Sequence, residues 1–575
     1  MLRGIGTSRG IGIGHVLIID NKNNEISRNK IHDTEQEKER FFNVREQFIK
    51  ETQQLLAQLE EKLGNNDKNA LVLKNQIYLA KDITTENEVC NAIEKDNICA
   101  EAAIEDTCDK LAGIFAAMDN PDMQQRVSDI VDMKDRMIQI MQGTVRADLT
   151  NLPENTVIVA KEIQPSMTAS MDTAHVVGIV AEKGGDTAHA SILARALEIP
   201  AVLSVKDVMS KVHNDDQIIV DGAYGEVFVN PTQRTLSIYD KKKKKYEEHI
   251  EELRTFVDKS TQTADGRTVI LAANIGGAAE ASKAVKEGAE GVGLFRTEFL
   301  FLNKNSLPTE EEQFHEYKKA AVLMKGKQLT IRTLDIGGDK DIPYMGLTRE
   351  NNPFLGYRAI RFCLDRVDIF TTQLRAILRA SAFGNIRIMV PMVTSVGEIQ
   401  SVKSMVRRIC KDLDRNQIAY DNNIKIGVMI ETPAAAVMAD VFATEADFFS
   451  IGTNDLTQYT IAVDRCNENV AYLYSAFNPA VLRLIKRTIA CAHEAGIEVG
   501  MCGEAAADPM MVPLLLTYGL DEFSVSTGKV LETRKSIADW TIKEAEQVAK
   551  KVMTMSSEKE VTDYLSDYFS ERKKK

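Results

Sequence analysis

The order of hydrophobic and polar residues divides the chain into three parts. Between residues 31 and 142, leucine, isoleucine and phenylalanine recur at helical spacing among Glu, Gln and Lys, with almost no proline or strand signal. The clear helix breakers in this part are Gly64–Asp67, Lys95–Asn97 and Met118–Asp122. We therefore expect several helices packed as a bundle and inserted into another fold. The charged face of such a bundle is either a plain scaffold or a docking face for a small partner.

Strand-like runs stand on both sides of this helical part. From Arg3 to Ile19, glycine alternates with apolar residues and the segment ends in an apolar run. Further short runs predict the strands Thr156–Ala160, Val176–Ala181, Ile199–Val205, Gln217–Asp221 and Glu226–Asn230. Together they indicate an α/β unit that includes the N-terminal strand. The lysine run from Lys241 to Lys245 follows in a helical pattern, which is typical of a solvated linker helix.

From Asp265 onward, strands alternate with helical stretches, the pattern of a parallel sheet. The predicted strands are Val269–Ala273, Gly291–Phe295, Leu329–Arg332, Ile386–Pro391, Ile426–Ile430, Phe448–Gly452, Val499–Cys502 and Phe523–Ser526. Eight strands in about 310 residues fit a (β/α)8 TIM barrel, whose active site lies at the C-terminal strand ends. The fold class predicted for the whole chain is α/β multidomain, with an inserted helical bundle and a C-terminal barrel.

Composition and charge narrow the classes of function. The 575 residues are enough for three or four domains, and the net charge of −13 argues against general binding to nucleic acid or to a membrane surface. The eight cysteines are scattered without a Cys-x-x-Cys pair, and no secretory leader or apolar run of membrane-spanning length is visible. We therefore expect reduced thiols, a cytoplasmic location, no nucleic-acid partner and no membrane insertion.

One histidine follows a glycine turn at the start of a predicted helix. Gly184 and Gly185 end the apolar run Val176–Val180, Thr187 can cap a helix, and Ala188–Leu197 is rich in helix formers. His189 thus falls in a first helical turn, where free N–H groups and the helix dipole stabilise an anion. This histidine either carries a phosphoryl group or merely faces solvent.

Polar residues follow the barrel strand ends in order: Arg296, Arg332, Glu431, Asn454, Asp455, Arg465 and Cys502. The arginines offer planar forks suited to phosphate and carboxylate oxygens. Glu431 and Asp455 can hold one Mg²⁺, which takes few carboxylates and adds substrate oxygens. Such a set indicates phosphoryl transfer. Cys502 is either a proton donor or acceptor at the substrate carbon, or a small core residue.

These residues carry a resemblance to a known family over essentially the full length. The matching stretches are Gly184–Val202, Gly293–Glu298, Arg332–Lys340 (RTLDIGGDK), Asn352–Arg361 (NPFLGYRAIR), Met429–Pro433 (MIETP), Phe448–Thr460 (FFSIGTNDLTQYT), Ala462–Asn467 (AVDRCN) and Gly500–Glu504 (GMCGE). In this order they resemble Enzyme I of the bacterial sugar phosphotransferase system, phosphoenolpyruvate–protein phosphotransferase.

The resemblance implies a reaction and a role for each candidate residue. His189 takes phosphate from phosphoenolpyruvate and passes it to a histidine of the small phosphocarrier protein HPr. Cys502 protonates the departing enolate to give pyruvate. The residues implied for phosphoenolpyruvate binding are Arg296, Arg332, Asn454, the backbone of Asp455, and Arg465; those implied for Mg²⁺ are Glu431 and the carboxylate of Asp455.

The resemblance also implies an arrangement of domains. A swivelling phosphohistidine α/β domain comprises residues 1–21 and 146–230, and the inserted HPr-binding helical domain comprises residues 22–145. A linker helix spans residues 231–262, and the phosphoenolpyruvate-binding barrel, residues 263–575, also forms a homodimer. The first step of sugar uptake is the implied context.

Several positions depart from the family pattern. Ala188 replaces a serine beside the histidine, and Asp186 adds negative charge near the phosphate. Cys466 stands where a glycine is usual, so that the turn aiming Arg465 is in question. In the helical part, Gln76 replaces a frequent histidine and Val131 a frequent arginine, while Arg126, Asp129 and Asp132 match; these changes bear on the choice of HPr partner.

Three other interpretations stay open at the level of sequence. Pyruvate phosphate dikinase and phosphoenolpyruvate synthase share the histidine domain and the barrel, but they need a nucleotide-binding domain, and residues 22–145 hold no Gly-rich phosphate loop. A paralogue could pass its phosphate to a regulatory HPr-like carrier. A catalytically inactive binding protein fits least, because the full set of candidate residues is present.

Overall fold

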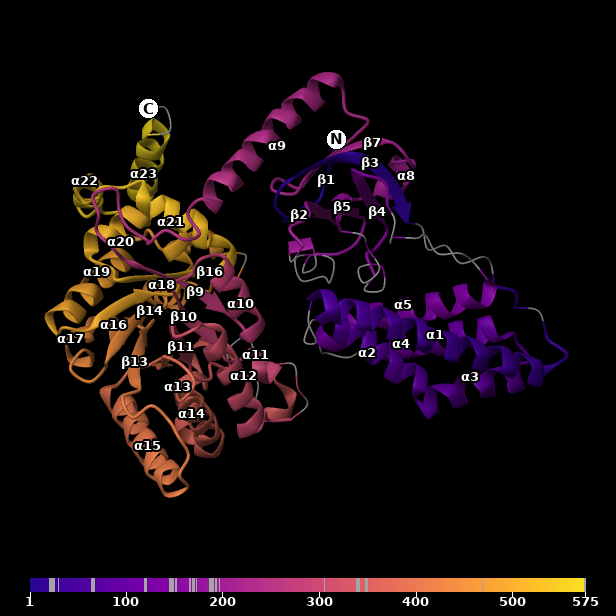
Figure 1. The fold of residues 1–575 in the computed structure, drawn as a ribbon, viewed down its shortest axis with the longest axis horizontal. Coiled ribbons are helices and arrows are strands. Elements are labelled where there is room, and N and C mark those ends of the chain that lie inside the picture. The colour runs from indigo at the N-terminus through magenta and orange to yellow at the C-terminus, as the bar shows by residue number, and fades with distance from the viewer. Residues whose placement is uncertain are drawn as a thin grey trace. The chain divides into compact units, whose positions relative to one another are not determined.

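The computed structural model separates into two compact units, residues 1–249 and 250–575, each described below on its own (Figure 1). The structure describes residues 1–19, 26–28, 30–63, 68–117, 121–143, 149, 152–164, 167, 171, 173–185, 191, 194–195, 197–302, 304, 306–337, 342–346, 350–467 and 469–572. Within these residues, we find no helix that is both long enough and apolar enough to cross a membrane.

A mixed sheet of eight strands forms one part of the first unit. Its order is β1-β8-β7-β3-β4-β5-β6-β2, and β3 pairs in parallel with β4 and antiparallel with β7. The N-terminal apolar run therefore lies inside the sheet. The strands are β1 (Leu2–Arg3), β2 (Ile5–Ser8), β3 (Ile11–Ile19), β4 (Thr156–Ala160), β5 (Val176–Ala181), β6 (Ala201–Leu203), β7 (Gln217–Asp221) and β8 (Glu226–Val229), with the short helix α8 (Val208–Lys211) between β6 and β7.

The central strands of this sheet are buried on both faces. In β4, Val157 and Val159 belong to one hydrophobic cluster, while Ile158 and Ala160 belong to another. Successive side chains of a strand point to opposite faces, so two apolar layers cover the sheet. This explains why its parallel strands read as continuous apolar runs in the sequence.

The helical bundle predicted between the strands is present. Its helices are α1 (Thr34–Leu63), α2 (Lys68–Lys81), α3 (Ile83–Asp96), α4 (Ala100–Ala116) and α5 (Pro121–Gln142). Fully buried apolar side chains, among them Phe48, Ile93 and Ile138, form a core of its own. The helical spacing of apolar residues therefore arises from packing of each helix against its neighbours.

One break in the bundle was not expected from sequence. The helical pattern runs unbroken from Lys68 to Asp96, but the structure ends α2 at Lys81 and begins α3 at Ile83. Asp82 separates them, and its side chain accepts a hydrogen bond from the backbone N–H of Thr85 at 2.9 Å. The predicted set of breakers was therefore incomplete, because a single N-capping aspartate restarts a helix without glycine or proline.

The lysine run lies on a long helix, α9 (Gln233–Arg254). Four of its five side chains are exposed, which confirms the predicted solvated face. The ammonium of Lys242 lies 4.2 Å from the ring centre of Tyr239 on the same helix and 3.9 Å from Asp221 at the end of β7.

The second unit contains a closed barrel of eight parallel strands, as predicted (Figure 1). The strands are β9 (Ile270–Ile275), β10 (Gly291–Arg296), β11 (Gln328–Arg332), β12 (Ile386–Val390), β13 (Lys425–Ile430), β14 (Phe448–Ile451), β15 (Glu498–Met501) and β16 (Glu522–Ser526). All eight predicted strands agree with these bounds to within one or two residues, because each is a short apolar run that ends at polar residues or glycine.

Helices follow the barrel strands in sequence. The α-helices are α10 (Ala278–Lys286), α11 (Phe299–Leu302), α12 (Glu310–Leu323), α13 (Ala359–Asp365), α14 (Val367–Ser381), α15 (Val396–Arg415), α16 (Pro433–Val437), α17 (Ala439–Phe442), α18 (Thr453–Ile461), α19 (Pro479–Glu494), α20 (Val512–Tyr518), α21 (Val530–Ala538), α22 (Ile542–Val552) and α23 (Glu558–Arg572). Short 3-10 turns are η1 (Pro343–Met345), η2 (Pro353–Leu355), η3 (Ala471–Leu473), η4 (Glu504–Ala507) and η5 (Thr527–Lys529).

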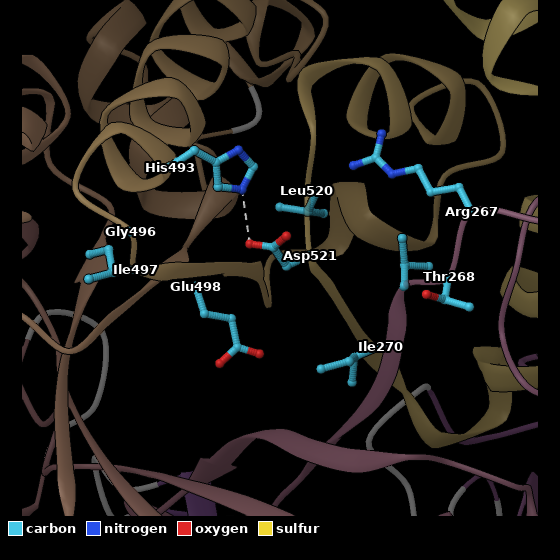
Figure 2. Close-up of a pocket in the computed structure, with 10 residues that line it drawn as sticks. Arg267, Thr268, Ile270, His493, Gly496, Ile497, Glu498, Leu520 and Asp521 are labelled. Atoms are coloured by element: carbon cyan, nitrogen blue, oxygen red, sulfur yellow. Dashed lines mark hydrogen bonds and ion pairs between the residues drawn. The ribbon is translucent and has the colours of Figure 1, made fainter.

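A hollow of about 620 Å³ opens at the N-terminal end of the barrel, where β9, β15 and β16 begin (Figure 2). His493 Nε2 lies 3.1 Å from Asp521 Oδ2, and the same oxygen accepts a hydrogen bond from Val499 N at 2.9 Å. Glu498 is bound to the buried Arg387 at 2.7 Å. These polar groups hold strand ends and loops together, at the face of the barrel opposite to the usual active site.

Candidate functional site

The C-terminal end of the barrel holds a smaller pocket of about 350 Å³. Every barrel residue predicted from sequence lines it: Arg296, Arg332, Glu431, Asn454, Asp455, Arg465 and Cys502. The hollow at the other end is larger, but this pocket gathers the charged and reactive side chains. Chemistry and not volume therefore identifies the candidate site.

Each of these residues is placed by the end of a strand. Arg296 and Arg332 are the last residues of β10 and β11, and Glu431 directly follows β13. Asn454 and Asp455 lie in the first turn of α18, which begins just after β14. Because the strands are parallel, their C-terminal ends meet at one rim, and residues far apart in sequence converge there.

Arginines and carboxylates alternate along one wall of the pocket. Arg332 is ion-paired with Glu298, and its Nη1 lies 3.0 Å from Asp335 Oδ2. Asp335 Oδ1 lies 2.9 Å from Arg358 Nη2, which is 3.4 Å from Asp455 Oδ2. The last arginine in this series of ion pairs is Arg465, whose Nη1 lies 3.4 Å from Asp455 Oδ1. The alternation fixes the arginine forks in place before any anion binds.

Burial and neighbouring charges act in opposite directions on these groups. Burial lowers the pKa of Arg332, but the carboxylates of Glu298 and Asp335 outweigh it, so its pKa lies above the ordinary value. Burial, followed by the charges of Asp455 and Asp335, raises the pKa of Glu431 to about 8. Three carboxylates thus crowd the same region, and added positive charge would stabilise it.

The residues present fit the Mg²⁺ expected from the resemblance. Asp455 Oδ1 is buried, and apart from the ion pair with Arg465 at 3.4 Å it accepts no hydrogen bond from any described residue. Glu431 Oε1 accepts from the backbone N–H of Met392 at 2.7 Å, and a side chain at Gly452 would come within 2.8 Å of Glu431 Oε2. Glycine at 452 therefore leaves this oxygen free space. No cluster of three or more His, Cys, Asp and Glu ligands occurs among the described residues, so substrate oxygens would have to complete a magnesium shell.

Cys502 lies at the apolar side of the same pocket. It is only 4% exposed and packs with Leu294, Met389, Met429 and Phe448. Burial raises the pKa of its thiol to about 11, and therefore the sulfur holds its proton at neutral pH. A protonated thiol beside a charged pocket can donate a proton to a substrate carbon.

The structure shows how the turn that carries Arg465 forms with Cys466 at the position where a glycine is usual. The Asp464 side chain accepts a hydrogen bond from Cys466 N at 2.9 Å, and Gln458 accepts from Arg465 N at 3.2 Å. Cys466 does not adopt a positive φ. The turn is therefore stabilised by side-chain acceptors and does not require glycine at this position.

Sequence reasoning missed five other polar or charged side chains that line the pocket. They are Glu298, Asp335, Arg358, Tyr474 and Glu504. All except Tyr474 stand inside the motifs that carried the resemblance, so those motifs were a usable signal. Tyr474 stands outside them, and only the fold shows that its hydroxyl donates to the carbonyl of Asn454 at 3.1 Å.

His189 lies outside the described residues, as do Asp186 and Ala188. The strand before them, β5, and the two glycines Gly184 and Gly185 are described. In the bundle, Gln76 is fully buried and donates to Asp132 Oδ2 and to the carbonyl of Asp129, each at 3.0 Å.

Comparison with known proteins finds related sequences along nearly the whole chain. Family models of PEP-utilising enzymes match in three segments: the N-terminal model at residues 3–126, the mobile domain at 152–225 and the PEP-binding domain at 250–542. The curated phosphoenolpyruvate-protein phosphotransferases of Bacillus sp. (strain S) and Geobacillus stearothermophilus are each 42% identical over 569 residues, covering 99% of this chain and 98% of the relative. The chain belongs to the phosphoenolpyruvate–protein phosphotransferase family. The protein of that name from Bacillus subtilis (strain 168) is 40% identical over 568 residues, covering 99% of both chains.

Membership of the phosphoenolpyruvate–protein phosphotransferase family confirms the predicted resemblance and the multidomain α/β fold. The match to the PEP-binding domain includes the whole pocket, from Leu294 to Glu504. The chain is therefore an enzyme of phosphoenolpyruvate-dependent phosphoryl transfer.

Proposed function

We propose that the barrel pocket binds phosphoenolpyruvate, that His189 takes its phosphoryl group, and that the phosphocarrier protein HPr receives it. The observation that carries this proposal is the combination found in one pocket. The pocket contains arginine side chains that are fixed by ion pairs, and beside them two carboxylates suited to a metal ion. It also contains a buried thiol that keeps its proton. Phosphoryl transfer from an enol phosphate needs these parts together.

In the first step, Arg296, Arg332 and Arg465 hold the phosphate and carboxylate of the substrate, with the amide of Asn454 and the backbone of Asp455. A lone pair of a His189 ring nitrogen forms a bond to phosphorus. The bond between phosphorus and the enol oxygen breaks, and its electron pair stays on that oxygen. Arg358 adds a further fixed positive charge, because it bridges Asp335 and Asp455.

Glu431 and Asp455 would hold Mg²⁺ in this pocket. When bound, the ion supplies charge neutralisation at the phosphate and enolate oxygens. We expect EDTA to abolish pyruvate formation from phosphoenolpyruvate and added Mg²⁺ to restore it. Undiminished turnover after complete chelation would contradict this assignment.

In the second step, Cys502 donates its thiol proton to the methylene carbon of the enolate. The carbon–carbon π pair forms the new C–H bond, an oxygen lone pair forms the carbonyl, and pyruvate results. The thiolate takes a proton from solvent after pyruvate leaves. The apolar neighbours of Cys502 keep water from competing for the carbanion.

The helical bundle offers a surface that suits a protein acceptor. Tyr78 and Ile83 lie on either side of the break between α2 and α3, and they are 74% and 72% exposed. Exposed apolar side chains beside an exposed acidic one, here Asp82, are typical of docking faces for basic partners. We assign HPr docking to residues 22–145, the phosphohistidine domain to 1–21 and 146–230, the linker to 231–262, and phosphoenolpyruvate binding to 263–575.

A homodimer formed through the barrel is part of the proposal. Val437 on α16, Val441 on α17 and Met438 between them are 52%, 39% and 45% exposed, which is unusual for apolar side chains so close together. A molar mass from light scattering that stays at one chain at micromolar concentration would contradict the dimer.

The proposed function is tested by supplying phosphoenolpyruvate, Mg²⁺ and an HPr-like carrier from the same cell, without ATP. We expect one pyruvate for each phosphoryl group that reaches the carrier. A requirement for ATP would instead favour a dikinase, and transfer only to a regulatory carrier would favour the signalling paralogue. Transfer to the carrier of sugar uptake supports a cytoplasmic first step of that pathway.

A further inference from the structure

Asn274 lies outside the pocket but is bound to the residue that we propose as the proton donor. It stands in β9, and β16 separates β9 from β15, the strand that leads to Cys502. Its Nδ2 donates to the carbonyl oxygen of Cys502 at 3.0 Å. A side chain from one strand thus reaches across a neighbouring strand to hold the backbone of Cys502.

The orientation of this amide is determined by its other partners. Asn274 Oδ1 accepts from the Ser524 hydroxyl at 2.7 Å, and Nδ2 also approaches the Ser524 carbonyl at 3.3 Å. A carbonyl can only accept, so the nitrogen must face the two carbonyls and the oxygen must face the hydroxyl. Ser524 is fully buried, and the amide is therefore locked in the orientation that donates to Cys502.

The hydrogen bond from Asn274 takes the place of a sheet hydrogen bond, because the Cys502 carbonyl lies beyond the last paired residues of β15. The ladder between β15 and β16 ends with Met501 paired to Phe523, and the ladder between β14 and β15 ends with Ile451 paired to Met501. Cys502 N still donates to the Ile451 carbonyl at 3.1 Å, but its own carbonyl has passed the end of the ladder. Asn274 is the donor that the structure gives to that carbonyl.

The local backbone needs such a restraint. Gly503 follows Cys502, and glycine leaves the chain many backbone conformations. The position must be glycine, because a side chain there would come within 1.9 Å of Thr453 Oγ1. Holding the Cys502 peptide from both sides fixes the direction of its side chain toward the pocket.

We propose that Asn274 is a positioning residue, which aims the Cys502 thiol at the methylene carbon of the enolate by holding the Cys502 carbonyl. This inference rests on the proposed role of Cys502. Asn274 takes no part in the chemistry, and the proton moves from sulfur to carbon as described above. Loss of alignment slows proton transfer while the arginines that bind the substrate stay in place.

The test is the steady-state kinetics of pyruvate formation by Asn274→Asp, which keeps the shape but replaces the donor by an acceptor. We expect kcat to fall roughly 10- to 100-fold, with KM for phosphoenolpyruvate within about twofold of the parent. Asn274→Ala, which removes the donor without adding charge, should show the same selective loss if the aspartate variant fails to fold. Asn416→Asp, the same change at the exposed C-terminal end of α15, should leave both constants unchanged.

A double-mutant cycle separates positioning from a general structural effect. In a Cys502→Ala background, the Asn274 changes should lower the residual kcat no further, because they act through the missing thiol. Additive losses, a parallel rise of KM, or wild-type kcat in both Asn274 variants would overturn the inference. Failure of the parent protein itself to form pyruvate would instead overturn the proposed function.

Discussion

At the scale of single residues, the pocket combines groups whose protonation states are set by burial. Cys502 and Glu431 both have raised pKa values, but only the thiol lies among apolar side chains. Glu431 faces carboxylates and arginines, and positive charge there favours its ionised form. The same barrel end therefore holds side by side the thiol that we propose as proton donor and the carboxylate that we propose as metal ligand.

Cys502→Ala tests the proton donor. We expect kcat for pyruvate formation to fall by roughly 10²- to 10⁴-fold, the range for removal of a general acid, with phosphoenolpyruvate affinity nearly unchanged. Steady-state kinetics together with calorimetric binding would measure both. Equal losses of turnover and binding would show that the thiol is only a packing residue.

Asp129 in the bundle predicts a dependence of local stability on pH. Burial, followed by the charge of Asp132, raises the pKa of Asp129 to about 7, although the Arg126 charge opposes this. A carboxyl group with a raised pKa in the folded state costs stability as pH rises from about 4 to 7. Asp129→Asn should therefore stabilise the bundle at pH 8, by up to about 4 kcal/mol because each pKa unit corresponds to about 1.4 kcal/mol, and change little at pH 4.

Hydrogen exchange of the α5 amides, compared between variant and parent at each pH, would measure this effect. Asp132, which accepts from Gln76, serves as a contrast, because Asp132→Asn alters a made hydrogen bond. Equal protection of parent and Asp129→Asn at pH 8 would show that the buried carboxylate is compensated.

At the scale of elements, the sequence predicted strands better than contacts. The barrel strands could be located because each apolar run ends at a polar residue, and Arg296, Arg332 and Glu431 mark three of these ends. The ion pair that joins Asp335 to Arg358 could not be predicted, since it brings together two residues that lie 23 positions apart in the sequence. Side-chain caps such as Asp82 were missed for a different reason, because a single residue does not produce a periodic pattern.

The opposite end of the barrel provides an element-scale prediction. Asp521 contacts His493 of α19 (Figure 2) and accepts a hydrogen bond from the backbone N–H of Val499 in β15. Asp521→Ala removes both interactions, and we expect a loss of about 1–2 kcal/mol in stability of the barrel. Thermal unfolding would measure this loss, and kcat and KM should stay at parent values. A fall in kcat without a fall in stability would show that this end of the barrel takes part in turnover.

At the scale of the whole molecule, the order of parts agrees with the family along the full chain. The matches run from the N-terminal model through the mobile domain to the PEP-binding domain, in that order. In the proposed function, the barrel pocket supplies the arginines that bind the substrate, the ligands of the metal ion and the acid. No histidine is among the described residues that line it. A histidine that accepts the phosphoryl group must therefore come from elsewhere in the chain, and we propose that it is His189, which follows Gly184 and Gly185 in the sequence.

The most direct test of this central claim is the site of phosphorylation. Incubation with ³²P-labelled phosphoenolpyruvate and Mg²⁺, without ATP, should label the chain on a single acid-labile, base-stable phosphohistidine. His189→Ala should abolish the label, while the variant still binds phosphoenolpyruvate. Label that persists in His189→Ala, or label that resists acid, would contradict the account.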